Sequence, residues 1–190
     1  DEESLVKSTA PILDRAGKTK IAISFNGNIV TDPKILREIK ERFPSFQYNF
    51  DAQLISRKLL VKLREGDLAS SVRSCMKEIE GAFSVAGITQ KGELFAFKDP
   101  YGLRPLCCGY SEDRKTCAVS SETVGLDING FEFDFEINPG ELVTASEEGF
   151  NREQLVKCEK RALCAFEFAY FARPDSRLGD KFVYEVREEF

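Results

Sequence analysis

Apolar residues recur every three or four positions in three early segments, which is the spacing of one face of a helix. We therefore predict helices over residues 33–43, 51–63 and 67–81. Asp51 and Asp67 stand where the second and third of these helices begin, and an aspartate at that place commonly caps the exposed N–H groups of the first turn. The first part of the chain is thus predicted to be rich in helices.

From residue 82 onward, the spacing of apolar residues changes from helical to alternating. Phe131, Phe133 and Phe135 alternate with acidic residues, which is typical of a strand with one buried face. This pattern and the turn residues between segments predict strands at residues 20–24, 82–89, 93–97, 106–110, 116–120, 141–145 and 154–158, with short helices at residues 121–126 and from residue 181. Early helices followed by antiparallel strands predict an α+β fold, with helices packed on two sheets.

Size and charge exclude several classes of function. The 190 residues are 42% hydrophobic and 31% charged, which is the balance of one soluble globular domain. The net charge of −5, with basic and acidic residues interleaved, argues against nucleic acid as a partner. No apolar run is long enough to cross a bilayer and no signal-like opening is present, so we expect no membrane association and a cytoplasmic location.

The chain contains few side chains that can act as a nucleophile or a general base. The chain has no histidine, which excludes a Ser-His-Asp or Cys-His pair and imidazole metal ligands. Its six cysteines show no CxxC spacing, so we predict reduced thiols and neither a zinc site nor a redox pair. A hydrolytic site would need another base, and the free α-amino group of an N-terminal nucleophile, with a pKa of about 8, is one solution.

Two polar positions are candidates for chemistry, and each also has a plain structural interpretation. Asn26 and Gly27 follow a predicted strand, and a side-chain amide beside a glycine N–H can donate two hydrogen bonds to one oxyanion. Asn-Gly is also the commonest hairpin turn, and residues 25–28 are predicted to form a loop. Asp51 can bind a substrate ammonium group or act only as a helix cap. The residues alone leave both choices open.

Four strings of the sequence resemble the amidophosphoribosyltransferase family, which catalyses the first committed step of purine synthesis. They are FNGNIV at residues 25–30, DPYGLRPL at 99–106, SSE at 120–122 and CAFEFAYFARPDS at 164–176. The second string is predicted to be a tight turn carrying a buried charge pair. The similarity runs over nearly the whole chain in the family's order. The last string separates this family from other glutamine amidotransferases of the same class.

The resemblance implies a fold and a site. The family's N-terminal half is a class II glutaminase with the N-terminal nucleophile hydrolase fold, a four-layer αββα sandwich of two antiparallel sheets. Residues 1–180 match this domain, incomplete at its N-terminus, and residues 181–190 match the start of the connection to a phosphoribosyltransferase domain. In the family, an N-terminal cysteine attacks glutamine and its own α-amino group carries the proton. Asn26 and Gly27 match the oxyanion hole, and Asp51 matches the carboxylate that receives the glutamine ammonium.

The resemblance also implies partners and cofactors. Glutamine is the expected substrate, the phosphoribosyltransferase domain of the same protein is the expected partner, and a homo-oligomer is expected. No cofactor is expected in this domain, whereas Mg²⁺ is expected in the transferase domain. Cys164 matches a position that ligates an iron–sulfur cluster in some relatives, and a buried structural thiol is the favoured alternative.

The chain departs from the family pattern at its start. Residue 1 is Asp, the opening Cys-Gly stretch and the Arg-Tyr-Ser-Thr loop are missing, and Phe25 replaces a common histidine. We therefore expect the chain to belong to something larger, and to be inactive by itself. Two alternatives remain: a non-catalytic relative that acts as a binding or regulatory module, and another class II enzyme such as glucosamine-6-phosphate or asparagine synthase. Retention of Asn26, Gly27 and Asp51 argues against the first, and residues 166–176 argue against the second.

Overall fold

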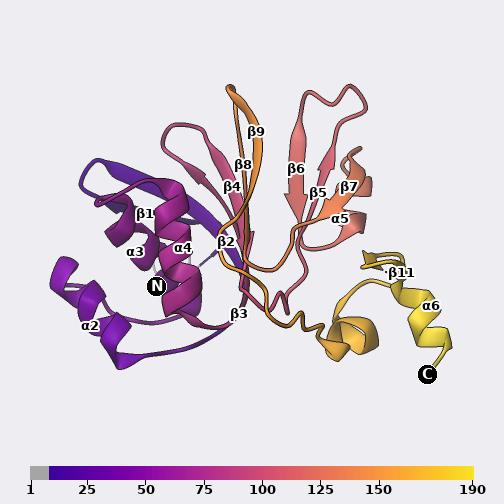
Figure 1. Ribbon diagram of the computed structural model, residues 1–190, viewed down its shortest axis with the longest axis horizontal. Coiled ribbons are helices and arrows are strands. Elements are labelled where there is room, and N and C mark those ends of the chain that lie inside the picture. The colour runs from indigo at the N-terminus through magenta and orange to yellow at the C-terminus, as the bar shows by residue number, and fades with distance from the viewer. Residues whose placement is uncertain (1–8) are drawn as a thin grey trace.

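The structure is a computed structural model that describes residues 9–190, so Asp1 lies outside the described residues. Three helices cover one side of a six-stranded antiparallel sheet, and a three-stranded antiparallel sheet lies on its other side (Figure 1). The short α5 lies on the outer side of the small sheet. The predicted α+β fold with two antiparallel sheets is therefore confirmed.

The strands of the two sheets come from different parts of the chain. The large sheet has the order β1-β2-β3-β4-β8-β9, and the small sheet has the order β6-β5-β7. The bounds of the large-sheet strands are β1 Ile12–Ala16, β2 Thr19–Val30, β3 Glu80–Thr89, β4 Leu94–Lys98, β8 Glu141–Ser146 and β9 Gly149–Gln154. The bounds of the small-sheet strands are β5 Cys107–Tyr110, β6 Cys117–Ser120 and β7 Glu132–Glu136.

Helices and short C-terminal elements complete the fold. The helices are α2 Pro33–Arg42, α3 Asp51–Leu63, α4 Leu68–Glu78, α5 Thr123–Asp127 and α6 Val183–Glu188. A π-helical turn, η1 (Glu167–Phe171), and a two-stranded hairpin, β10 (Arg177–Leu178) with β11 (Lys181–Phe182), precede α6. None of the helices among residues 9–190 is both long and apolar enough to span a membrane.

Two predictions of local structure are wrong, and one strand is not predicted. The predicted loop at residues 25–28 is part of β2, because Asn26 pairs with Ser84 and Gly27 with Phe83 across β3. β1 lies in a part of the chain for which no element is predicted. The strand expected at residues 154–158 is β9 instead, which ends at Gln154. Residues of β9 are mostly exposed, so they carry little apolar signal, whereas the neighbouring apolar segment at 155–156 packs into the core.

Two apolar layers hold the elements together. The larger layer lies between the helices and the large sheet, where Phe83, Phe95 and Phe97 are fully buried. The smaller layer lies between the two sheets and is built on Ala96 and Val143 of the large sheet. Neighbouring residues of each strand therefore point into different layers, as the two-residue period of a strand requires.

A fully buried lysine links the three large helices. Lys58 of α3 is 0% exposed, and its ammonium group bonds the carboxylates of Glu38 from α2 and Glu78 from α4. Burial alone would raise the pKa of both glutamates, but the hydrogen bonds and charge of Lys58 outweigh burial and lower it. The cluster therefore stabilises the folded state above the usual pKa of glutamate, near 4.5, and loses this contribution as the pH falls through the lowered value.

We predict that Lys58→Met lowers the free energy of unfolding at neutral pH by about 1–2 kcal/mol. The loss stays below that of a fully buried pair because both carboxylates are partly exposed. Denaturant titrations should show the difference from the wild type shrinking as the pH falls below 4.5, where the unfolded glutamates protonate. Lys62→Met removes only a partly exposed partner of Glu38 and serves as the control. A difference that is independent of pH would contradict this account.

Candidate active site

One edge of β2 is open for half of its length. β1 pairs only with Thr19–Ile23, and β3 covers the opposite edge of β2 as far as Val30. From Ser24 onward, the edge on the β1 side has no strand partner among residues 9–190. Strand edges carry free N–H and C=O groups that can bind another molecule. The candidate residues of the sequence lie along this edge.

Asn26 stands at the mouth of the gap between the two sheets. Its neighbours Phe25 and Phe83 pack toward the helices, so Asn26 points to the face that the small sheet covers. Two adjoining hollows of about 340 and 220 Å³ both include Asn26 and Ser121 in their walls. Arg104 and Glu122 line the larger of them. The amide side chain is therefore accessible beside a polar hollow.

The backbone N–H of Gly27 points to the open edge. The carbonyl of Lys20 accepts a hydrogen bond from the N–H of Gln90, the residue that follows β3. In the antiparallel register the even-numbered residues of β2 therefore bond β3, and the N–H groups of the odd-numbered ones point away. A glycine is required here, because a Cβ atom would lie 2.2 Å from the carbonyl oxygen of Ala82. Two glycines, Gly27 and Gly81, thus let β2 and β3 approach closely where the donor is presented.

Asp51 turns toward the same edge. Its Oδ2 accepts the N–H of Ile29 at 2.8 Å, and its Oδ1 accepts the hydroxyl of Tyr48. The predicted role of Asp51 as an N-cap is wrong: Phe50 is the N-cap, and Asp51 is the first residue of α3. Asp32 and Asp67, by contrast, do cap their helices through side-chain bonds. Because Asp51 does not cap the helix, its carboxylate lies at the strand edge.

The structure brings the three candidate residues together. The N–H groups of Gly27 and Ile29 lie on one edge, two residues apart, which is roughly 7 Å along a strand. The Asp51 carboxylate lies at the Ile29 end of this stretch of edge, and the Gly27 N–H lies at its other end. An extended glutamine measures about 6 Å from its α-nitrogen to its side-chain oxygen, given standard bond lengths. The two ends of this stretch of edge are therefore spaced to suit the two ends of one such molecule.

The charge pair predicted within the DPYGLRPL string is not formed. Asp99 is fully buried, but its carboxylate accepts backbone N–H groups, from Phe83 at 3.0 Å and Tyr101 at 2.8 Å. Arg104 pairs with Glu167 of η1 at 3.0 Å. The turn is thus held by main-chain bonds, whereas its arginine ties the C-terminal segment to the wall of the Asn26 hollow.

Cys164 lies just before η1, and its carbonyl accepts the N–H of Glu167. Its side chain is partly buried and lines a small hollow with Lys98 and Glu136. An iron–sulfur cluster needs four thiolates, and residues 9–190 hold no group of three or more potential metal ligands. Among the residues that line this hollow, Cys164 is the only thiol.

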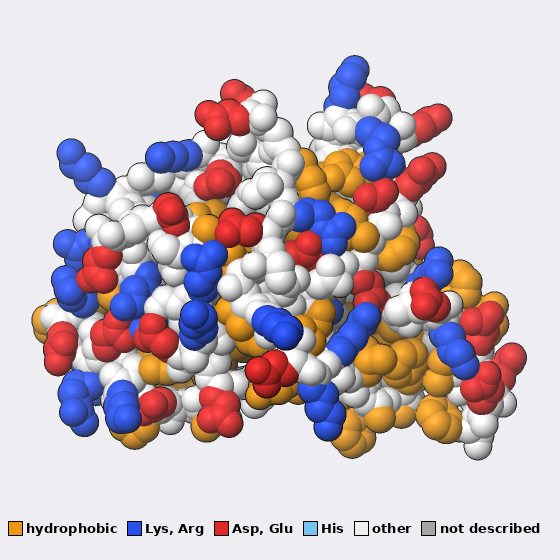
Figure 2. Space-filling view, in the orientation of Figure 1, with side chains coloured by type: hydrophobic (Ala, Val, Ile, Leu, Met, Phe, Trp, Pro, Cys, Tyr) orange, Lys and Arg blue, Asp and Glu red, His pale blue; other side chains and the backbone are white. Residues whose placement is uncertain are grey.

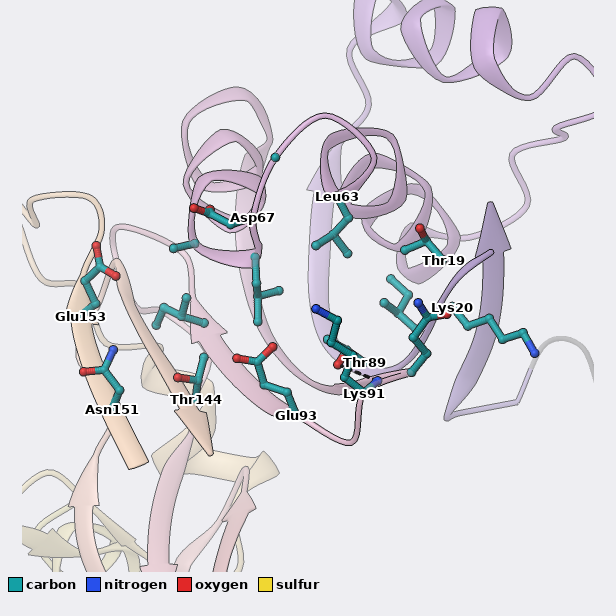
Figure 3. Close-up of a pocket in the computed structure, with 16 residues that line it drawn as sticks. Thr19, Lys20, Leu63, Asp67, Thr89, Lys91, Glu93, Thr144, Asn151 and Glu153 are labelled. Carbon is teal, nitrogen blue, oxygen red and sulfur yellow. Dashed lines mark hydrogen bonds between the residues drawn. The ribbon is translucent and has the colours of Figure 1, made fainter. Parts of the chain in front are cut away.

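A second groove, of about 480 Å³, lies far from these residues. It is formed where the α3–α4 turn meets the ends of the strands, with Lys20 and Lys91 on one side and Glu93 and Glu153 on the other (Figure 3). Its walls contain none of the predicted site residues. Its charges are mixed and partly or fully exposed, so the lining of the groove presents no buried polar or charged group that would fix the orientation of a ligand.

Sequence reasoning missed two residues of the Asp51 environment. Tyr48 donates its hydroxyl to Asp51 and accepts the hydroxyl of Thr31 at 3.2 Å. Thr31 follows β2, whereas Tyr48 precedes α3 by three residues. No periodicity or motif links these positions, because the contact depends on how the segment between α2 and α3 returns to the end of β2.

Comparisons with known proteins show the family to which the chain belongs. Residues 4–127 match the family described as "Glutamine amidotransferase domain". The amidophosphoribosyltransferase of Archaeoglobus fulgidus is 29% identical over 188 residues, which cover 98% of this chain and 40% of that protein. The enzyme of the same name from Methanocaldococcus jannaschii is 31% identical over 200 residues, covering 96% of this chain and 42% of that protein. The chain thus spans about two fifths of the length of these relatives.

Solved structures give the same result. The glutamine phosphoribosylpyrophosphate amidotransferase from B. subtilis, in complex with ADP and GMP, superposes with a TM-score of 0.83 at 26% identity. The match covers 96% of this chain and 39% of that one. A glutamine aminotransferase class-II domain protein from Silicibacter pomeroyi, with a TM-score of 0.52 at 16% identity over 72% of this chain and 66% of that one, shares the fold alone.

We predict that Gly27→Ala destabilises the protein by about 3 kcal/mol or more, because its methyl group would meet the backbone of β3. Gly149→Ala is a matched control: Gly149 also has a positive φ, of 134°, but a Cβ there would meet no atom within 4 Å. Thermal unfolding should therefore show a far smaller loss for the control. Equal losses in the two variants would mean that the approach of β2 and β3 imposes no constraint.

Proposed function

We propose that this chain, which belongs to the glutamine amidotransferase domain family, is the glutaminase domain of an amidophosphoribosyltransferase. In this role it hydrolyses glutamine and supplies ammonia for the formation of phosphoribosylamine in purine synthesis. The observation that carries the proposal is the alignment of the Gly27 N–H and the Asp51 carboxylate on one open edge of β2. A helix cap or a hairpin turn would produce neither the edge position nor the spacing.

Each candidate residue has a separate chemical role in this proposal. Asp51 receives the α-ammonium group of glutamine, which sets the register of the substrate along the edge. A thiolate then attacks the side-chain amide carbon, and the carbonyl oxygen becomes an oxyanion that accepts bonds from Asn26 and from the Gly27 N–H. As the adduct collapses, the α-amino group that took the thiol proton gives it to the leaving nitrogen, the C–N bond breaks and ammonia is released. Water then hydrolyses the thioester to glutamate and the free thiol.

The nucleophile in this proposal is an N-terminal cysteine supplied from outside the 190 residues. Burial raises the pKa of Cys75, Cys107 and Cys108 to about 12, so these thiols stay protonated and unreactive. A free α-amino group beside the thiol would act as the base, since the chain has no histidine. We therefore expect the 190-residue polypeptide by itself not to turn over glutamine.

A surface near the C-terminus supports the further proposal that a transferase domain of the same protein packs there. Seven large apolar side chains that are 41–88% exposed lie within the last 28 residues: Leu163, Phe166, Tyr170, Phe171, Phe182, Tyr184 and Phe190. Figure 2 shows hydrophobic side chains gathered in this region, over η1 and α6. Apolar groups concentrated in this way mark an interaction site. The curated relatives that the chain matches are more than twice its length.

We predict that Asn26→Ala, in a full-length protein that carries this domain, lowers the glutamine-dependent rate by about 10²–10³-fold, the usual loss for one oxyanion donor. The effect should fall on kcat, because the bond strengthens only as the oxyanion forms. Asp51→Asn should instead raise KM for glutamine, since the ammonium contact exists in both ground and transition states.

The control is the nitrogen source. Free ammonia bypasses the glutaminase site, so both variants should keep the ammonia-dependent rate of the wild type. Loss of both reactions in equal measure by a folded Asn26→Ala protein would refute the assignment. A wild-type protein that binds glutamine without hydrolysing it would favour the non-catalytic alternative.

A further inference from the structure

The Asp51 carboxylate is held in place from both sides. The N–H of Ile29 bonds Oδ2, and the phenol of Tyr48 bonds Oδ1, so each oxygen has one fixed donor. Two donors from different segments stop the carboxylate from rotating about its side-chain bonds. The Ile29 bond belongs to the backbone of β2, whereas the Tyr48 bond depends on a single hydroxyl group in the segment between α2 and α3.

Tyr48 is itself oriented by a third residue. The hydroxyl of Thr31 donates to the phenol oxygen at 3.2 Å, and the phenol donates to Asp51, which gives a chain of two hydrogen bonds in one direction. In such a chain, each hydrogen bond polarises the next group and so strengthens the next hydrogen bond. The hydrogen bond to Asp51 also raises the pKa of Tyr48, so the phenol keeps its proton and remains a donor at physiological pH.

The remaining capacity of the carboxylate fits an ammonium group. An ionised carboxylate has about four lone-pair sites, and the two fixed donors occupy one on each oxygen. Because a phenol is neutral, Tyr48 fixes the direction of the carboxylate without forming an ion pair with it. Both conditions favour a cation over a neutral donor at the free sites.

We propose that Tyr48 is a positioning residue for the selection of glutamine, which orients the Asp51 carboxylate toward the α-ammonium group of the substrate. This inference rests on the function proposed above and adds a residue to it. Tyr48 touches neither the reacting amide nor the oxyanion in this account. Its contribution therefore belongs to substrate binding and not to the chemical step.

The test is Tyr48→Phe in a full-length protein that carries this domain, because this change removes the hydroxyl and keeps the ring. We expect KM for glutamine to rise about 5- to 20-fold, with kcat within about twofold of the wild type. The rise is smaller than that for the loss of a direct bond to a charged group, because the N–H of Ile29 still holds Asp51. Thr31→Val should shift KM in the same direction by a smaller factor. Tyr101→Phe is the control, since the Tyr101 ring is 54% exposed and its backbone, not its hydroxyl, makes the local bonds.

Two further measurements separate positioning from a general structural role. In an Asp51→Asn background, Tyr48→Phe should change KM by less than about twofold, because the two residues act as one unit. Hydrolysis of glutaramate, which lacks the α-ammonium group, should be the same in Tyr48→Phe and wild-type proteins. An unchanged or lowered KM for glutamine in Tyr48→Phe, or an equal loss with both substrates, would overturn the inference while leaving the proposed function intact. A wild-type protein that does not hydrolyse glutamine would overturn the proposed function and this inference with it.

Discussion

Backbone N–H groups must find a partner, and the open edge of β2 is where this requirement shapes the molecule most. The backbone groups of every second residue of β2 bond β3, and β1 pairs with only the first part of the opposite edge. The N–H of Ile29 is satisfied by a carboxylate from a helix that begins 22 residues later. The bond between the Ile29 N–H and Asp51 fixes where α3 begins and how the segment before it runs. The same arrangement leaves the N–H of Gly27 accessible.

The helix layer is built so that this arrangement is rigid. The first residue of α3 bonds the strand edge, and the middle of the same helix holds the buried ammonium group of Lys58 between α2 and α4. Asp14 of β1 adds a third tie to α3, because it bonds the hydroxyl of Ser56 and the guanidinium group of Arg57. A helix fixed at three places along its length cannot shift its first residue relative to β2 without breaking buried polar contacts.

Local patterns in the sequence were sufficient for the helices but not for the site. Asp32 followed by Pro33 predicts the start of α2 correctly, because capping depends on adjacent residues. Asn26-Gly27 predicts a turn by the same local logic, yet the residues form a strand because Ser84 and Phe83 of β3 lie opposite them. The roles suggested for Asn26, Gly27 and Asp51 came from a family resemblance. The contact of Tyr48 with Asp51 depends on tertiary packing, which neither spacing nor motif encodes.

The carboxylate of Asp51 also affects how this domain behaves among copies of itself. An open strand edge is a template on which a second chain can add a strand, and such additions lead to aggregates. Asp51 occupies one of the edge N–H groups and places a negative charge beside the next. An approaching strand would have to displace that bond and bring its own backbone against an ionised group. The bond from Asp51 that completes the strand edge at Ile29 therefore also opposes the addition of a second strand at that place.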